Sequence, residues 1–313
     1  MQKYLKNKIK SRLCFGTLSI SPWQGNFPLN KGVQLLKSAV ENSVNFFDSA
    51  EIYQTYAYLR ALIKFYPDVI ITTKTFAYTK EQAKNSVEKA LRELDRDYID
   101  IFLLHEQESI LTIKGHWEAF EELLKYKEKG IIKAVGISTH TTAGVKGATE
   151  TKEIDIIHPL YNYKGWGIKD GTVEEMLFAI KNAYKAGKEL YAMKALAGGH
   201  LIKDNINALK HVFNIKEFSA VAVGIQSYEE LMCNLALAKG LEPEEQFLNS
   251  CLKQPRFLLI EDWCEGCGNC VEMCQQKALS INDATQKVQV DKNKCILCGY
   301  CSSVCKEFCI KVI

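Results

Sequence analysis

VIITTKTFAYTKEQAKNSVEKALRELDRDYIDIFLL, residues 69–104, contains two apolar runs separated by a longer amphipathic segment. The runs at 69–74 and 98–104 are rich in β-branched and apolar residues, which favours buried strands. The segment KEQAKNSVEKALREL between them has apolar residues at helical spacing, which predicts an amphipathic helix. The stretch therefore predicts a strand–helix–strand unit with parallel strands.

The same unit recurs along the first part of the chain. Strands are predicted at 12–17, 44–49, 69–74, 98–104, 132–138, 154–159, 189–194 and 218–224. Amphipathic segments separate them, so strands and helices alternate eight times within about 240 residues, the size and order of an α/β protein of the (β/α)8 TIM-barrel class. A doubly wound open sheet is the alternative, but the G-x-G-x-x-G motif that usually follows its first strand is absent.

Two cysteine runs follow the alternating region, and both read C-x2-C-x2-C-x3-C. Their members are Cys264, Cys267, Cys270, Cys274, Cys295, Cys298, Cys301 and Cys305. Eight thiolates at this spacing predict two [4Fe-4S] clusters, because each cubane takes four soft sulfur ligands. Zinc is a weaker alternative because no histidine follows residue 211. Disulfides would need an exported chain, and MQKYLKNKIK at the N-terminus lacks the apolar core of a signal peptide.

This cysteine region resembles a bacterial two-cluster ferredoxin. In that pattern the fourth cysteine of each run binds the other cluster. One predicted ligand set is then Cys264, Cys267, Cys270 and Cys305, and the other is Cys295, Cys298, Cys301 and Cys274. The proline that usually follows the fourth cysteine is replaced by Gln275 and Lys306, and Cys309 is expected to be a buried thiol rather than a ligand.

Composition and breaks in the pattern suggest the domain organisation. The 313 residues are 47% hydrophobic, which is typical of a globular protein, and we expect a barrel over 1–245, a linker over 246–257 and a small α+β ferredoxin-like domain over 258–313. In the last of these, FLLIEDW predicts a strand and ALSINDATQKVQV a hairpin. A net charge of +3 does not suggest a nucleic-acid partner, and we expect no membrane span. Reduced cysteines suit the cytoplasm.

Four ionisable residues follow or end predicted strands at one end of the barrel, where such barrels carry their active sites. They are Asp48, Tyr53, Lys74 and His105. Reduction of a carbonyl needs a proton donor, and a lysine beside a tyrosine lowers the pKa of its phenol. We therefore expect Tyr53 as general acid, Lys74 as its electrostatic partner, Asp48 as the anchor of Lys74, and His105 as the group that orients the carbonyl. Taken singly, each is more simply explained as a polar residue where a strand meets water.

The ordered tetrad, with the elements D-S-A-x-x-Y, T-T-K and L-L-H-E, resembles the aldo-keto reductase family over residues 12 to about 240. The resemblance implies a TIM barrel that binds NAD(P)H across its mouth, without a Rossmann domain, and acts on a small carbonyl compound. It also implies cofactor contacts at Ser138, Thr139, His158, Met193, Gly224, Ser227, Glu229 and Asn234.

Three positions depart from the family pattern. His158 replaces the usual glutamine against the nicotinamide, and Met193 replaces a stacking aromatic residue. Glu230 stands where many NADPH-preferring members carry an arginine, which predicts NADH preference or weak nicotinamide binding, because a carboxylate repels the 2′-phosphate. Lys194, at the end of the seventh predicted strand, is expected to be solvated.

These observations favour an oxidoreductase that reduces an aldehyde or ketone, coupled or appended to an iron–sulfur electron-transfer module that exchanges electrons with a redox partner protein. A hydride carries two electrons, whereas each cluster carries one, so the link between the two parts is open. One alternative is an electron-transfer relay whose barrel no longer uses nicotinamide. The other is a barrel whose clusters are purely structural.

Overall fold

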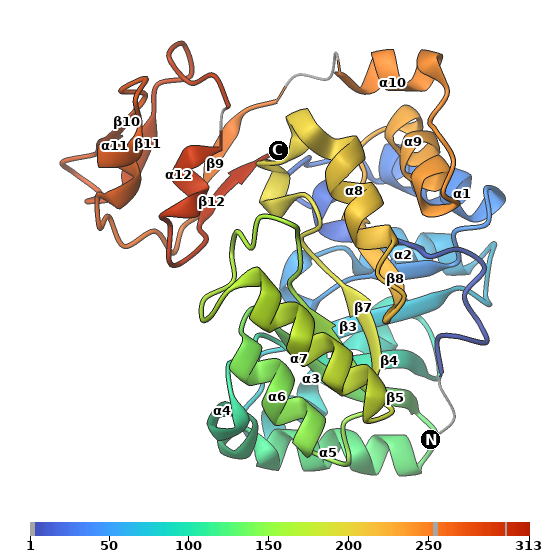
Figure 1. Cartoon of the computed structure of the whole chain (residues 1–313). Helices are drawn as coiled ribbons and strands as arrows, with labels where there is room; N and C mark the ends of the chain where they lie inside the picture. Colours follow the sequence, from blue (N-terminus) through green and yellow to red (C-terminus); the bar gives the residue numbers. More distant parts are fainter. Residues whose placement is uncertain (1–3, 253–255, 298) are drawn as a thin grey trace.

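The computed structural model describes residues 4–252, 256–297 and 299–313. A closed barrel of eight parallel strands forms its larger part (Figure 1). The strands are β1 Leu13–Gly16, β2 Phe46–Asp48, β3 Ile70–Thr75, β4 Ile99–Leu104, β5 Ile132–Thr139, β6 Ile156–Pro159, β7 Glu189–Ala192 and β8 Phe218–Gly224. Each pairs with its neighbour in chain order, and β1 pairs with β8. The TIM-barrel prediction is confirmed, and the open sheet is excluded.

Helices surround the barrel, as Figure 1 shows. They are α1 Leu29–Glu41, α2 Tyr56–Ile63, α3 Lys80–Leu94, α4 Ile110–Gly115, α5 Trp117–Glu128, α6 Thr142–Glu150, α7 Val173–Lys185, α8 Asn205–Phe213 and α9 Tyr228–Ala238. α3 begins with a capping box, in which the Thr79 and Gln82 side chains bond each other's backbone N–H groups. The apolar faces of the helices pack on the outer faces of the strands and form the largest buried cluster.

A second, smaller apolar cluster fills the inside of the barrel. Leu5, which precedes the first strand, is fully buried in it beside Phe46 and Tyr191. The backbone N–H groups of Leu5 and Lys6 donate to the carboxylate of Glu189, at 2.8 and 2.7 Å. Because Glu189 begins β7, this segment closes the amino-terminal end of the barrel, opposite the predicted site.

The predicted linker, 246–257, is largely helical where the structure describes it. α10, Glu245–Leu252, packs against α9 and so lies with the barrel. Residues 253–255 of the predicted linker lie outside the described residues.

The C-terminal region has the predicted α+β character. It contains β9 Leu258–Ile260, α11 Asn269–Met273, β10 Leu279–Ile281, β11 Val288–Val290, α12 Tyr300–Ser303 and β12 Ile310–Val312. β10 and β11 form the predicted antiparallel hairpin. β12 was not predicted; it pairs antiparallel with β9, so the first and last strands of this region lie side by side.

The C-terminal region packs against the loop that follows β7, at the carboxyl-terminal end of the barrel (Figure 1). Nε2 of His200 lies 2.9 Å from the carbonyl oxygen of Ile310, and Nζ of Lys203 donates to the carbonyl of Ile296 at 2.7 Å. Gly199 has a φ of +89°, and a Cβ there would lie 1.8 Å from the carbonyl oxygen of Val312. This close approach requires glycine.

Candidate active site

A buried ion pair lies at the carboxyl-terminal ends of β2 and β3. Nζ of Lys74 donates to Oδ2 of Asp48 at 2.8 Å and to the carbonyl oxygen of Ser49 at 2.7 Å. Lys74 is 1% exposed and Asp48 5% exposed. Burial of two charges is stable only when they are paired and hydrogen-bonded, so these contacts fix the position of the ammonium group.

Tyr53 lies on a short 3-10 helix, Glu51–Tyr53, with its ring centroid 5.1 Å from Nζ of Lys74. Contrary to expectation, the pKa of its phenol is raised rather than lowered. Burial is the main cause, followed by the negative charges of Asp48 and Glu106. Because Asp48 already neutralises Lys74, the lysine cannot offset the loss of solvent around the phenol. The phenol is therefore protonated at neutral pH.

His105 directly follows β4, and its ring lies edge-on to that of Tyr53, with centroids 6.1 Å apart. The ring stacks on Phe76 at 4.4 Å. Burial, and then the charge of Lys74, lowers the pKa of His105, so its imidazole is neutral. Its Nδ1 is buried and has no hydrogen-bond partner among the described residues.

His158 of β6 joins the same network from the barrel interior. Its Nδ1 donates to the carbonyl oxygen of Tyr191 at 2.8 Å, and its ring stacks on Tyr191 at 3.8 Å. The hydroxyl of Tyr191 donates to Oδ1 of Asp48 at 2.8 Å. Burial is the main cause that lowers the pKa of His158, to about 4, so the ring is neutral, and the Asp48 carboxylate is positioned by the ammonium of Lys74 and the hydroxyl of Tyr191.

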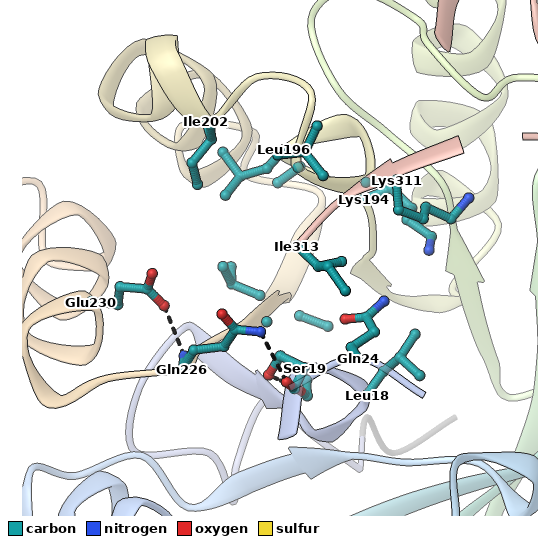
Figure 2. Close-up of a pocket in the computed structure, with 18 of the residues that line it drawn as sticks. Leu18, Ser19, Gln24, Lys194, Leu196, Ile202, Gln226, Glu230, Lys311 and Ile313 are labelled. Carbon is teal, nitrogen blue, oxygen red and sulfur yellow. Dashed lines mark hydrogen bonds between the residues drawn. The ribbon is translucent and has the colours of Figure 1, made fainter. Parts of the chain in front are cut away.

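A cavity of about 380 Å³ opens beside these residues (Figure 2). Asp48 and Tyr53 line it at the tetrad. From there it extends past the glycine-containing loop after β7 to Gln226 and Glu230 at the start of α9. The volume lies within the usual range of small-molecule sites.

The predicted cofactor contacts divide into two groups. His158, Met193, Gly224 and Asn234 line the cavity, whereas Ser138, Thr139, Ser227 and Glu229 do not. Oγ of Ser138 accepts a hydrogen bond from the N–H of Glu106 at 3.0 Å, and Oγ1 of Thr139 lies 3.0 Å from Oγ1 of Thr141. Ser227 caps α9 by accepting from the N–H of Glu230. The side chains of Ser138 and Thr139 are therefore engaged in local hydrogen bonds.

Glu230 does not stand alone at the cavity wall. Arg256, which precedes β9, forms an ion pair with it and donates to Oε1 of Gln226 at 3.1 Å. Glu230 therefore presents an ion pair rather than an isolated carboxylate at this end of the cavity, and the expected NADH preference stays a prediction. Nε of Arg256 is buried without a partner in the described structure.

One wall of the cavity was not predicted from the sequence. Leu297, Lys311, Val312 and Ile313, all from the C-terminal region, line the same cavity as Tyr53. No local pattern marks them, because their role depends on how β12 packs against the barrel. Lys194, expected to be solvated, is partly buried and lines the cavity as well.

Four of the cysteines are brought into one group. The pKa of Cys270 is raised to about 11, chiefly by burial and then by the charges of Cys305, Cys264 and Cys267. These are the members of the first predicted ligand set. Sγ of Cys309 lies 3.4 Å from Sγ of Cys305, so Cys309 is a buried neighbour of the set. Cys298, of the second set, lies outside the described residues.

The two cysteine runs repeat one backbone conformation. Positive φ angles occur at Gly266 (+67°), Gly268 (+82°) and Lys277 (+49°), and at the equivalent positions Leu297 (+53°), Gly299 (+83°) and Phe308 (+48°). Left-handed residues in such loops turn backbone N–H groups inward, which suits anionic iron–sulfur sites. No group of three His, Cys, Asp or Glu side chains in the described ranges is spaced for a single metal ion. A cubane differs, since each of its irons takes one thiolate.

Comparison with known proteins agrees with both parts of the structure. The aldo/keto reductase family model matches residues 12–256, and a 4Fe-4S dicluster domain model matches residues 263–309. The chain therefore belongs to the aldo/keto reductase family. The predicted fusion of an oxidoreductase barrel of this family to an iron–sulfur module is confirmed.

The individual relatives are distant. The chain is 31% identical over 126 residues to the uncharacterized oxidoreductase YqkF of Bacillus subtilis, which covers 35% of this chain and 40% of that protein. It is 23% identical over 277 residues to L-galactose dehydrogenase of Arabidopsis thaliana, covering 74% and 85%. The holo form of aldo-keto reductase AKR11C1 from Bacillus halodurans has a TM-score of 0.61 at 20% identity, covering 77% and 91%, and so shares the fold.

Among the described residues, no helix is both long enough and apolar enough to cross a membrane.

Proposed function

We propose that the barrel reduces the carbonyl group of a small molecule in the cavity at its mouth, with Tyr53 as the proton donor. The observation that carries this proposal is the buried pair of Lys74 and Asp48, 2.8 Å apart, beside a phenol that faces the cavity. A reduced nicotinamide, NADH or NADPH, would supply the hydride. The residues of the chain then hold the carbonyl and deliver the proton.

Three of the tetrad residues have distinct tasks in this proposal. Tyr53 keeps its proton until negative charge develops on the carbonyl oxygen, because burial holds its pKa high. The ammonium of Lys74 then stabilises the phenolate that Tyr53 leaves behind, because it lies 5.1 Å from the centroid of that ring. Neutral His105, with its ring edge-on to Tyr53, orients the carbonyl oxygen.

The cavity has features that fit a dinucleotide. It runs from the tetrad to α9, and its lining includes Gly16, Gly198 and Gly224, where a backbone can approach a ligand closely. His158 and Met193 border the reacting end. Arg256, with its unpartnered Nε, borders the other end. Ser138 and Thr139, which line no part of the cavity, are left out of the proposed contacts.

A Tyr53→Phe variant tests the proposal. In anaerobically purified protein we expect carbonyl reduction to fall about 10²- to 10⁴-fold, the range for loss of a general acid, with nicotinamide affinity retained. Tyr78→Phe is the matched control, since Tyr78 is 56% exposed and lies outside the cavity lining. Full activity of Tyr53→Phe, or failure of the unaltered protein to bind NADH or NADPH, would contradict the proposal.

We propose further that the C-terminal region holds two [4Fe-4S] clusters through the exchanged ligand sets. The donor chemistry, the grouping of Cys270 with Cys264, Cys267 and Cys305, and the repeated left-handed turns support this. Such clusters would carry one electron each. Placing the module against the cavity favours electron exchange with the barrel or with a redox partner protein, and a reducing cytoplasm would suit both.

A pair of cysteine variants separates ligands from neighbours. Cys305→Ser should lower the iron content of the anaerobically purified protein and alter its electron paramagnetic resonance spectrum, because a serine hydroxyl is a poor iron ligand. Cys309→Ser should leave the iron content unchanged. Equal iron loss in both variants would contradict the proposed ligand set.

The relay function remains the second candidate, and one observation favours it. Four residues of the iron–sulfur region line the cavity, which brings that region to the site where a bound molecule would lie. Bleaching of the cluster absorbance by NADH alone would indicate coupling between the two parts. Carbonyl reduction with no change in cluster absorbance during turnover would favour the structural alternative.

A further inference from the structure

Two lysines, one from each domain, meet at the tetrad end of the cavity. Lys194 follows β7 of the barrel, and Lys311 lies in β12 of the iron–sulfur region; both line the cavity. Figure 2 shows their side chains extending together, away from Gln226 and Glu230. Their ammonium groups lie 5.8 and 3.8 Å from the ring centroid of Phe308.

These lysines lack the partner that buried cations require. Lys311 is 4% exposed, and Lys194 is partly buried. Lys311 donates to the carbonyl of Phe308, but within the described part of the chain no carboxylate lies within 4 Å of either ammonium group. Burial of an ammonium group without a counter-charge is energetically unfavourable, so a bound anion would stabilise this pair of lysines.

Two carboxylates act on the lysines from a distance: the charges of Glu106 and Glu261 raise the pKa of Lys194, and the charge of Glu261 raises the pKa of Lys311. Asp48 is committed to Lys74, and Glu106 lies at the side chain of His140. Burial raises the pKa of the Glu261 carboxyl, whereas the charges of Lys311 and Lys194 lower it. Burial lowers the pKa of Lys194, and burial followed by the charge of Lys194 lowers the pKa of Lys311 well below its usual value; a bound anion would reverse both shifts, since an opposite charge favours the ammonium form.

We propose that Lys194 and Lys311 bind a carboxylate of the substrate, so that the substrate class is carbonyl compounds that carry a carboxylate. This inference rests on the proposed function and names its substrate class. The two amino groups hold the carboxylate beside the tetrad, where Tyr53 and His105 receive the carbonyl of the same molecule. Half of this anion site belongs to the iron–sulfur region, so the barrel alone does not complete it.

A cofactor phosphate is the other source of an anion in this cavity. Two observations favour the substrate: both lysines point away from the Glu230 end, and the charge of Lys194 is a minor cause of the lowered pKa values of His105 and His158 at the tetrad. The cofactor affinities measured below distinguish the two sources.

Direct binding of succinate, a carboxylate probe that cannot be reduced, tests the proposal by calorimetry on the complete, anaerobically purified protein. Lys194→Met and Lys311→Met should each weaken succinate binding at least about tenfold, the loss expected for one charge-assisted hydrogen bond. Lys194→Arg should retain most of the affinity. Lys216→Met, at an exposed barrel position, is the matched control and should bind succinate normally.

Four results would overturn the proposal: no succinate binding to the unaltered protein, equal binding of neutral succinamide, unchanged succinate affinity in both methionine variants, or loss of NADH and NADPH affinity in those variants with succinate affinity retained. The last result would assign the lysines to cofactor phosphate. Lys194→Met keeps the test valid should Lys311→Met displace β12, and the cluster absorbance reports such displacement. Because succinate binding needs no turnover, a failure of carbonyl reduction is distinguishable from a failure of this site.

Discussion

Arg256 and Glu230 form an ion pair that joins the segment before β9 to the start of α9. Both side chains line the cavity, and both are largely buried. The pair fixes the entry into the iron–sulfur region against the barrel. It also means that the cation nearest this end of the cavity is engaged by a carboxylate.

Release of Arg256 should alter cofactor preference. In a Glu230→Gln variant the guanidinium is free to bind a 2′-phosphate, so we expect the affinity for NADPH relative to NADH to rise about tenfold, the value of one charge-assisted contact. Fluorescence titration with each nucleotide measures the ratio. Glu229→Gln, one residue away and outside the cavity lining, should leave it unchanged. An unaltered ratio in Glu230→Gln would remove Arg256 from cofactor binding.

Loss of the buried lysine of the tetrad should destabilise the barrel. Lys74→Met leaves the carboxylate of Asp48 buried without its cation, which should lower the free energy of unfolding by about 3–5 kcal/mol. Adding Asp48→Asn should recover part of this loss. Arg60→Met, in an exposed pair with Asp95, is the control and should cost less than about 1 kcal/mol. Calorimetry of the barrel transition checks these values, and a Lys74→Met loss as small as the control would contradict the inferred cost.

Buried histidines should make the protein less stable in mild acid. The pKa of His158 is lowered from 6.5 to about 4, so between these values the unfolded chain binds a proton that the folded chain does not. Stability therefore rises with pH across this window, and His158 alone accounts for up to about 3 kcal/mol of it. In a His158→Gln variant the melting temperature should fall less between pH 7 and pH 5. An unchanged pH dependence would show that other groups dominate.

Gly199 should be essential for docking of the iron–sulfur region. Gly199→Ala places a Cβ against the carbonyl oxygen of Val312, so β12 must move away from the barrel. Gly240→Ala is a matched control, because Gly240 also has a positive φ, +74°, but a Cβ there meets nothing within 4 Å. Both variants bear the backbone strain, about 1 kcal/mol. Limited proteolysis near residue 256 should accelerate in Gly199→Ala alone; equal acceleration in both would attribute the effect to strain.

Local patterns predicted the barrel well, because each strand and helix carries its own periodicity. β8 was predicted with its observed bounds, and Asp48, Lys74 and His105 lie where strand ends meet the cavity end of the barrel. β12 escaped prediction because its pairing with β9 joins segments far apart in the chain and leaves no local signal. The burial of Leu5 depends on the distant Glu189 and leaves no local signal.

The chemistry of the site was harder to predict than its position. The raised pKa of Tyr53 results from a balance between burial and charge that a sequence cannot weigh. Ser138 and Thr139 were expected at the cofactor, but hydrogen bonds to Glu106 and Thr141 engage their side chains. The Lys194 and Lys311 pair requires knowing how the two domains pack.

The repeated turns of the cysteine runs give the iron–sulfur region an approximate internal symmetry, and docking to the barrel breaks it. Lys277 and Phe308 share one left-handed conformation, yet Lys277 is exposed, whereas Phe308 is 2% exposed and lies against Gly198 of the barrel. Gly268 has open space where its counterpart Gly299 contacts His200. The two halves thus differ in their neighbours rather than in their backbone. A few side chains are therefore enough to dock an internally symmetric iron–sulfur region to a barrel through one of its halves, while the backbone of the cysteine loops stays the same in both halves.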